Sequence, residues 1–300
     1  MRMKGEEEFY SNAYKDNLLS KSEQKRINFF LSKIPICNRV LDLGCADGRI
    51  IDRINSDYKI GIDIVIKLLR NVTTKVYASN ISDLPFDDNS FDVVISTEVL
   101  EHLDDKTFHK ALKEMNRVSS KHIVISVPYR EQLIQLLTHC SNCKRIYHAF
   151  LHKKSFSDND FVEMFPDFKI VTSFKYGTTS NIPKFLLKLK YITGSYFVGE
   201  SSICPYCKGE KFSKKLNLFN KIFNYFVGFL RILIRYKKTP RRIIVIYLKK
   251  DINQSFKHSD VQNILVCPKC QEKIIFQDHI AVCSNKHIFY FNDNILDFRI

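Results

Sequence analysis

The sequence has no tryptophan, so its 24 phenylalanines and 14 tyrosines carry the aromatic packing. The N-terminal residues Met1–Glu8 have no apolar signal core, which argues against secretion. Six of the nine cysteines occur in Cys-x-x-Cys pairs, a spacing that favours metal ligation in a reducing compartment over a disulfide framework. We therefore expect a cytoplasmic protein, with one large domain and one small domain in its 300 residues.

Acidic residues are almost missing from one part of the chain. Residues 181–250 contain two of them against 16 lysines and arginines, whereas residues 251–300 contain six acidic and five basic residues. Such a basic segment is expected to meet an anionic partner, such as RNA, a phospholipid surface or a charged polymer.

Long uninterrupted apolar runs are also missing. Lys215 to Lys238 is predicted to be one helix with a narrow polar stripe and a broad apolar arc. Arg231 within it, and the shortness of its apolar runs, disfavour a transmembrane span. Three alternatives stay open for the apolar arc: packing on its own domain or in a homodimer, a peripheral position at a membrane surface, and contact with nucleic acid.

A glycine-containing turn follows the first apolar run of the chain. Val40, Leu41 and Leu43 predict a strand that ends at Gly44-x-x-x-Gly48, and the apolar positions that follow predict the start of a helix. Glycine allows positive φ and close approach of a ligand, and a helix start presents free N–H groups. Ala46 occupies the middle position, so the full dinucleotide-binding fingerprint is absent. Asp63 ends a second strand, 19 residues after Gly44.

Asp42-x-Gly44-x-Ala46-x-Gly48 resembles the first motif of class I S-adenosylmethionine-dependent methyltransferases, of the type 11-like group. The run from Asn80 to Ser96, with Leu-Pro-Phe and Ser-Phe-Asp-Val-Val inside it, resembles the same family, as does Glu98–Leu103. The resemblance implies an α/β, Rossmann-like fold: a seven-stranded mixed sheet with helices on both faces. It also implies S-adenosylmethionine as the cofactor.

The resemblance implies specific roles for some of these residues. Asp63 would hold the ribose. The side-chain oxygen of Asn80 would accept a hydrogen bond from the adenine amino group, but it lacks the negative charge of the acidic residue that the family has at this position. His102 is a candidate general base, and its alternative is a hydrogen-bonded structural histidine; no catalytic residue is assigned. The expected cofactor-binding residues are Asp42, Gly44, Cys45, Ala46, Gly48, Asp63, Ile64, Asn80, Ile81, Ser96 and Thr97.

Two sets of residues have the spacing of zinc ligands. Cys267, Cys270, Cys283 and His287 predict a C-terminal zinc ribbon, which resembles the small zinc-ribbon activators of tRNA and protein methyltransferases. It also resembles the zinc module fused to a ribosomal-RNA guanine methyltransferase. A second zinc site is predicted, with two open ligand sets and unliganded structural cysteines as the remaining alternative. The sets are Cys140, Cys143, Cys204 and Cys207, or Cys140, Cys143, His148 and His152.

The predicted organisation is a methyltransferase domain over residues 1–250, with a basic insertion at about 180–240, and a zinc ribbon over residues 251–300. Three functions compete: methyl transfer to a small-molecule, lipid-linked or glycan acceptor; RNA methylation; and a non-catalytic zinc-stabilised scaffold. The intact turn and Asp63 argue against the scaffold, and the nearly neutral ribbon argues against an RNA grip. The sequence does not name the methyl acceptor.

Overall fold

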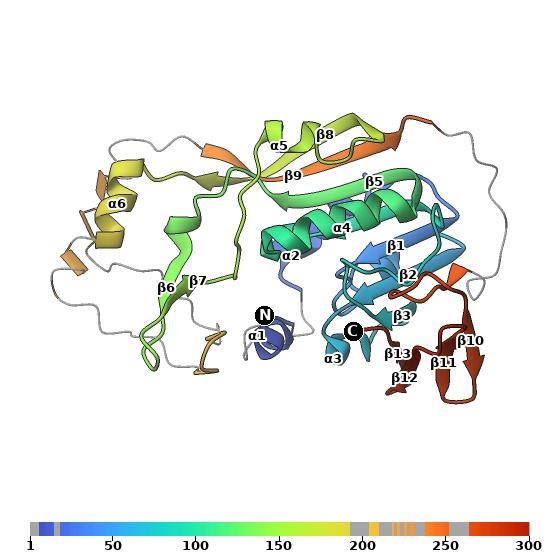
Figure 1. Cartoon of the computed structure of the whole chain (residues 1–300). Helices are drawn as coiled ribbons and strands as arrows, with labels where there is room; N and C mark the ends of the chain where they lie inside the picture. The colour runs from blue at the N-terminus through green and yellow to red at the C-terminus, as the bar shows by residue number, and fades with distance from the viewer. Residues whose placement is uncertain are drawn as a thin grey trace. The chain divides into compact units, whose positions relative to one another are not determined.

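The computed structural model describes residues 6–14, 19–192, 204–209, 218, 221–222, 225–226, 229–230, 238–251 and 264–299. The chain divides into two compact units. Unit 1 comprises Met1–Asp16, Pro128–Ser157 and Lys175–Ile243, and unit 2 comprises Asn17–Val127, Asp158–Phe174 and Ile244–Ile300. Figure 1 shows the elements of both units along the chain.

Unit 2 is built on a β-sheet with a parallel centre. Its first strands are β1 (Arg39–Leu43), β2 (Tyr58–Asp63), β3 (Lys75–Ala78), β4 (Phe91–Thr97) and β5 (Ser119–Pro128), which pair in parallel in the order β3-β2-β1-β4-β5. β9 (Lys238–Lys249) and β8 (Phe168–Ser180) continue the sheet beyond β5. These seven strands confirm the predicted Rossmann-like α/β class.

The central strand is buried along its whole length. All five residues of β1 are buried, and its three aliphatic side chains are fully inaccessible. A parallel strand covered on both faces requires a continuous apolar run, which explains the run seen in the sequence. The carboxyl end of this strand leads into the glycine turn.

Helices with local start signals flank these strands. α2 (Lys21–Leu31) begins with a capping box, in which the Glu23 N–H donates to Ser20 Oγ and the Ser20 N–H donates to Glu23 Oε2. α4 (Asp105–Val118) begins where the Asp104 carboxylate accepts the Thr107 N–H, and its apolar face is buried. The shorter helices of the unit are α3 (Ile66–Leu69), α5 (Asp158–Val162), and the 3₁₀ turns η1 (Ile51–Arg53) and η2 (Leu100–His102).

The prediction of a helix after the glycine turn is wrong. The structure forms only the single 3₁₀ turn η1 there, and β2 begins at Tyr58. Ile54 is already extended, because the chain must reverse within a few residues to reach the next strand. A one-turn 3₁₀ element presents few aligned N–H groups, so a helix dipole does not contribute to this site.

The C-terminal ribbon joins the main sheet. It consists of β10 (Ile274–Gln277), β11 (Ile280–Cys283), β12 (Ile288–Asn292) and β13 (Ile295–Asp297), paired in antiparallel order. β13 then pairs in parallel with β3, so the sheet has eleven strands rather than the seven predicted (Figure 1). An unpaired β3 edge would leave backbone groups without partners, and β13 supplies those partners.

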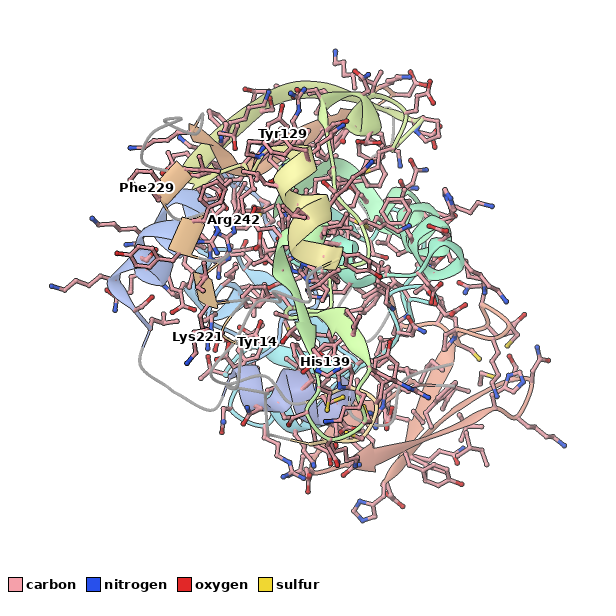
Figure 2. The ribbon with its side chains drawn as sticks, turned by 90° about the vertical axis from the view of Figure 1, so that its left-hand side faces the viewer. Tyr14, Tyr129, His139, Lys221, Phe229 and Arg242 are labelled. Carbon is pink, nitrogen blue, oxygen red and sulfur yellow. The ribbon has the colours of Figure 1, made fainter. Side chains whose placement is uncertain are left out.

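Unit 1 contains the helix α1 (Glu6–Ala13), the turn η3 (Leu133–Leu136), the hairpin of β6 (Leu137–His139) and β7 (Ile146–His148), and α6 (Lys184–Ile192). Figure 2 labels side chains of this unit, among them Tyr129 and His139. Phe9, Tyr147 and Leu151 are buried together with Cys140 and Cys204 in a small core.

The predicted helix from Lys215 to Lys238 lies mostly outside the described residues. Its described positions 218, 221–222, 225–226 and 229–230 are helical, whereas Lys238 already belongs to β9. The polar linker expected at 250–262 lies outside the described residues from Ile252 onward. Among the residues that are described, no helix combines the length and hydropathy needed to cross a membrane.

Candidate functional site

The glycine turn after β1 has a backbone that side chains would obstruct. Gly44 and Gly48 have φ values of 78° and 80°. A Cβ on Gly44 would lie 2.4 Å from Cγ2 of Val99, and a Cβ on Gly48 would lie 2.8 Å from Oδ2 of Asp52. Both positions therefore require glycine on conformational and on steric grounds.

Ala46, where the family has glycine, also adopts a left-handed conformation, with φ of 48°. Its N–H donates to Oδ2 of Asp63 at 3.0 Å, and this bond offsets part of the cost of the left-handed backbone. The N–H groups of Gly44 and Cys45 both donate to the Ile62 carbonyl, at 2.8 and 3.0 Å. The turn is thus attached to the end of β2.

Asp42 is a buried acid without a complete set of partners. It is 1% exposed, and its Oδ1 has no hydrogen-bond partner among the described residues. Burial, and then the neighbouring Asp63, raise the pKa of Asp42 to about 8. An acid held in this way is ready to ionise when a cation binds beside it, and S-adenosylmethionine carries an ammonium and a sulfonium.

Asp63 ends β2 at the same edge of the sheet. Its Oδ1 accepts the Val65 N–H at 2.8 Å, while Oδ2 holds the turn as described above. A carboxylate oxygen is a hydrogen-bond acceptor, the kind of group that would hold sugar hydroxyls. The next residue, Ile64, accepts a hydrogen bond from Arg299 of the ribbon at 2.9 Å.

The segment after β3 holds the expected adenine contacts. Oδ1 of Asn80 accepts the Ser82 N–H at 3.1 Å, which leaves one lone pair of that oxygen for an adenine amino group. Ile81 beside it is 7% exposed.

The expected contacts to the methionine half lie at the end of β4. Ser96 Oγ donates to the Leu43 carbonyl at 3.3 Å, and Ser96 pairs in register with Leu43. Thr97 is the last residue of the strand. Since Leu43 also pairs with Ile62, and Asp63 with Ala78, the register brings the ends of β1 to β4 to one edge. This is the edge at which α/β sheets of this kind bind ligands.

His102, the candidate base, lies in η2 after β4. It is half-buried.

The sequence did not predict the hydrogen bonds that hold the loop after Ile81. Arg117 of α4 donates to the carbonyls of Phe86 and Leu84, at 2.6 and 3.2 Å, and Glu114 accepts the Leu84 N–H at 2.7 Å. On its other side the ribbon pairs with this loop, because the Val266 N–H donates to the Pro85 carbonyl at 3.1 Å. No short motif announces these long-range contacts.

The ribbon cluster has the geometry of a tetrahedral metal site. Nδ1 of His287 lies 3.4, 3.5 and 3.4 Å from the Sγ atoms of Cys267, Cys270 and Cys283, and the last two sulfurs are 3.7 Å apart. Zinc–sulfur bonds of about 2.3 Å place tetrahedral ligand atoms about 3.6–3.8 Å apart. The four residues fit zinc, and the backbone N–H of Glu272 lowers the pKa of Cys270 to about 6, which favours the thiolate.

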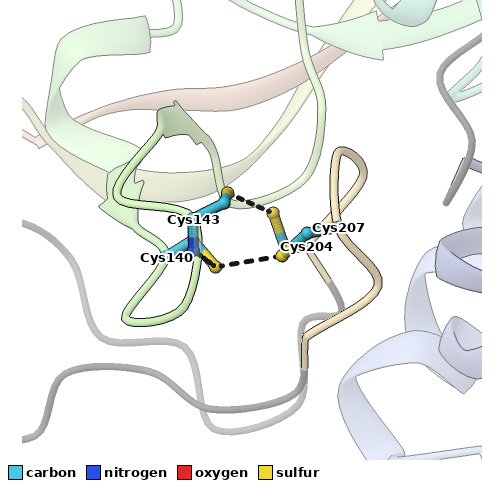
Figure 3. Close-up of side chains that lie close together, drawn as sticks. All are labelled: Cys140, Cys143, Cys204 and Cys207. Carbon is cyan, nitrogen blue, oxygen red and sulfur yellow. Dashed lines mark hydrogen bonds between the residues drawn. The ribbon is translucent and has the colours of Figure 1, made fainter.

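The second cluster, called the knuckle cluster here, joins distant parts of unit 1. Cys140 lies 3.6 Å from Cys207, and Cys143 lies 3.6 Å from Cys204, sulfur to sulfur (Figure 3). These spacings are too long for disulfides, and all the cysteines are free. The four sulfurs suit one zinc ion, so the geometry favours the four-cysteine set.

The two histidines of the alternative ligand set belong to another group. Nδ1 of His152 lies 2.5 Å from Oε2 of Glu131, which is a direct hydrogen bond rather than the spacing across a metal. The His148 ring stacks on His152 with centroids 4.8 Å apart. His148 is 6% exposed, and its Nδ1 accepts the N–H groups of Phe150 and His152 at 3.3 and 3.1 Å.

That arrangement defines the protonation of His148. With Nδ1 accepting, the neutral ring carries its proton on Nε2, and Nε2 is buried without a hydrogen-bond partner among the described residues. Burial, and then His152, lower the pKa of His148 to about 4. The neighbouring Leu151 has φ of 59°, a strained value for a bulky residue. Glu131 had no sequence signal.

One family model and one curated relative match part of the chain. Residues 41–125 match the family model described as a methyltransferase domain. The uncharacterized protein MJ0638 of Methanocaldococcus jannaschii is 32% identical over 126 residues, which cover 41% of this chain. The chain spans 54% of the length of that relative.

Solved structures give weaker likenesses. A chain from the complex of the Haloferax volcanii Trm112 methyltransferase activator with a methyltransferase is 15% identical, with TM-score 0.48, and covers 84% of this chain and 100% of its own. A methyltransferase from Archaeoglobus fulgidus is 19% identical, with TM-score 0.43, and covers 76% and 94%.

Because both TM-scores are below 0.5, the assignment depends on the domain match and on the site. The matched residues include Asp42, the glycine turn and Asp63. Residues 41–125 therefore resemble a methyltransferase domain.

Proposed function

We propose that the chain transfers the methyl group of S-adenosylmethionine to a small-molecule, lipid-linked or glycan acceptor. The observation that supports this most is the buried Asp42, with an unpartnered oxygen, directly before a turn that only glycine can form. Asp63 would hold the ribose, Asn80 and Ile81 the adenine, and Ser96 and Thr97 the methionine half. The bound cofactor would supply a methyl group already activated on a sulfonium.

The alternatives are less well supported. RNA methylation would use the basic insert together with the zinc ribbon to hold RNA, but the ribbon region has six acidic residues against five basic ones and offers no basic surface of its own. A non-catalytic scaffold would have no use for two glycines at positive φ and a buried acid in one turn. Positioning of the acceptor then supplies most of the catalysis, because the leaving group needs no further activation.

The test of cofactor binding is titration calorimetry with the zinc-loaded chain. Asp63→Ala should weaken S-adenosylmethionine binding by about 10- to 100-fold, because charge-assisted hydrogen bonds to the ribose are lost. Asp57→Ala, at an exposed position before the start of β2, is the control and should bind like the wild type. Unchanged affinity in Asp63→Ala would remove the ribose assignment, and preferential binding of a nicotinamide dinucleotide would remove the proposed function.

A further inference from the structure

Helix α6 of unit 1 exposes apolar side chains. Leu186 and Leu187 are buried, so one side of the helix packs on the unit. Phe185 and Leu189, one helical turn apart, are 64% and 41% exposed. Lys184 and Lys188 precede them and are exposed. The exposed side of α6 therefore combines large apolar side chains with lysine ammonium groups.

The described helical residues between 218 and 230 show the same combination. Leu218, Ile222, Phe226 and Phe229 are 75%, 61%, 52% and 53% exposed. Their spacing of four, four and three residues places them on one side of a helix. Lys221 is exposed at the margin of this stripe, and Figure 2 labels it together with Phe229. An apolar stripe that faces solvent indicates a binding partner, because removing apolar surface from water lowers the free energy.

The charge of this part of the chain indicates the partner. Residues 181–250 contain 16 lysines and arginines against two acidic residues. Exposed apolar side chains on a cationic helix are the features by which amphipathic helices lie in the interface of an anionic bilayer. Each lysine near such a surface adds to the attraction.

We propose that unit 1 docks on an anionic lipid surface through α6 and through the stripe of Leu218, Ile222, Phe226 and Phe229. The apolar side chains enter the boundary between headgroups and acyl chains, and Lys184, Lys188 and Lys221 contact lipid phosphates. If the proposed methyl transfer holds, on which this last step rests, the acceptor is a lipid or a lipid-linked molecule present at that surface.

Other occupants fit the same surface less well. A second copy would bring two strongly cationic segments together, and their repulsion opposes a dimer. RNA would use the cations and the aromatic rings, but it offers nothing to exposed leucine and isoleucine side chains. A bilayer satisfies both the charge and the aliphatic groups.

Vesicle co-sedimentation of the full zinc-loaded chain tests the proposal. The chain should bind vesicles of equal parts phosphatidylglycerol and phosphatidylcholine, and bind phosphatidylcholine alone far less. The double variants Phe185→Ser/Leu189→Ser and Phe226→Ser/Phe229→Ser should each lower the partition coefficient at least about tenfold. The matched control is Ile275→Ser/Tyr290→Ser, which removes two side chains of the ribbon that are 59% and 63% exposed and should not change binding.

Zinc content and cofactor affinity, measured on each variant, establish that it is folded. Several results would overturn the proposal: no binding to the anionic vesicles, binding that both double variants retain in full, a stable dimer in light scattering that the same variants dissociate, or binding of a mixed tRNA pool that they abolish. The assay contains neither cofactor nor acceptor. A failure of methyl transfer would therefore leave its result intact, and a failure of docking would leave the proposed methyl transfer intact.

Discussion

The ribbon cluster and the knuckle cluster have similar ligands, but the ligands of the knuckle cluster are much farther apart in the sequence. Cys267 and His287 are 20 positions apart, whereas Cys143 and Cys204 are 61 positions apart. The ribbon ion would organise a local module, and the knuckle ion would tie two distant segments together. One metal thus serves to fold a small structure, and the other to close a long loop.

The two clusters also support different parts of the molecule. The ribbon is hydrogen-bonded to Ile64, Ala78 and Pro85, which adjoin the expected ribose and adenine contacts. The knuckle cluster packs with Phe9 of α1 and with Leu151, next to His152. Metal loss at the first should therefore affect cofactor binding, and metal loss at the second should affect the packing of unit 1.

The largest expected effect is from Cys267→Ser/Cys270→Ser. The ribbon has little core of its own, so loss of its zinc should unfold it, with a cost of about 10 kcal/mol in metal-binding free energy. We expect one zinc fewer per chain and cofactor binding at least about tenfold weaker, because the supports of Ile64 and Pro85 are lost. Metal analysis and calorimetry measure both. Cys37→Ser, outside either cluster, is the control; unchanged cofactor affinity in the double variant would separate the ribbon from the cofactor site.

Cys204→Ser should have a smaller effect, confined to unit 1. Release of a loop of 61 positions is worth about 4 kcal/mol of closure entropy. One zinc per chain should be lost, and the amides of β6 and β7 should exchange faster with deuterium. Cofactor affinity should stay within about twofold of the wild type. A variant that retains all its zinc would favour ligands other than Cys204, and a loss of cofactor affinity would contradict the separation of roles.

The smallest effect is expected from Asp42→Asn, and it has opposite signs for stability and binding. An unfolded aspartate titrates near about 3.9, whereas folded Asp42 titrates at about 8. Between these values the folded state holds an extra proton, so the free energy of unfolding falls as the pH rises. Asparagine has no such titration and should be more stable at pH 8, by about 1–3 kcal/mol.

Without a carboxylate to ionise, Asp42→Asn should also bind S-adenosylmethionine more weakly. Thermal unfolding at several pH values, with calorimetry, measures both effects. Asp57→Asn, at an exposed position, should follow the wild-type curve. A wild-type chain whose stability rises between pH 5 and about 8, while Asp42→Asn stays flat, would reverse the sign worked out here.

The elements that carry local signals were predictable. The glycine turn and the zinc-ligand spacing depend on residues close together in the sequence, and the structure contains both. The helix expected after Gly48 failed because a tertiary requirement, the short path to β2, outweighed apolar spacing. The four-cysteine set and its histidine alternative could not be separated, because spacing along the chain does not determine which side chains meet.

Contacts between distant segments gave no signal. Glu131 is an isolated glutamate in the sequence, and only the fold brings it to His152. The pairing of β13 with β3 was also not predicted. An edge strand can pair with many other strands, and the backbone hydrogen bonds that join them do not depend on the identity of the side chains. The boundaries drawn at residues 250 and 251 remain a prediction.

The pairing of β13 with β3 has a further consequence for the behaviour of the chain. Without the ribbon, β3 would present an open row of amide and carbonyl groups to other molecules, and such edges template intermolecular aggregation. A fragment truncated at Asp251 should therefore precipitate rather than persist as a smaller enzyme. The ribbon protects the solubility of the whole sheet.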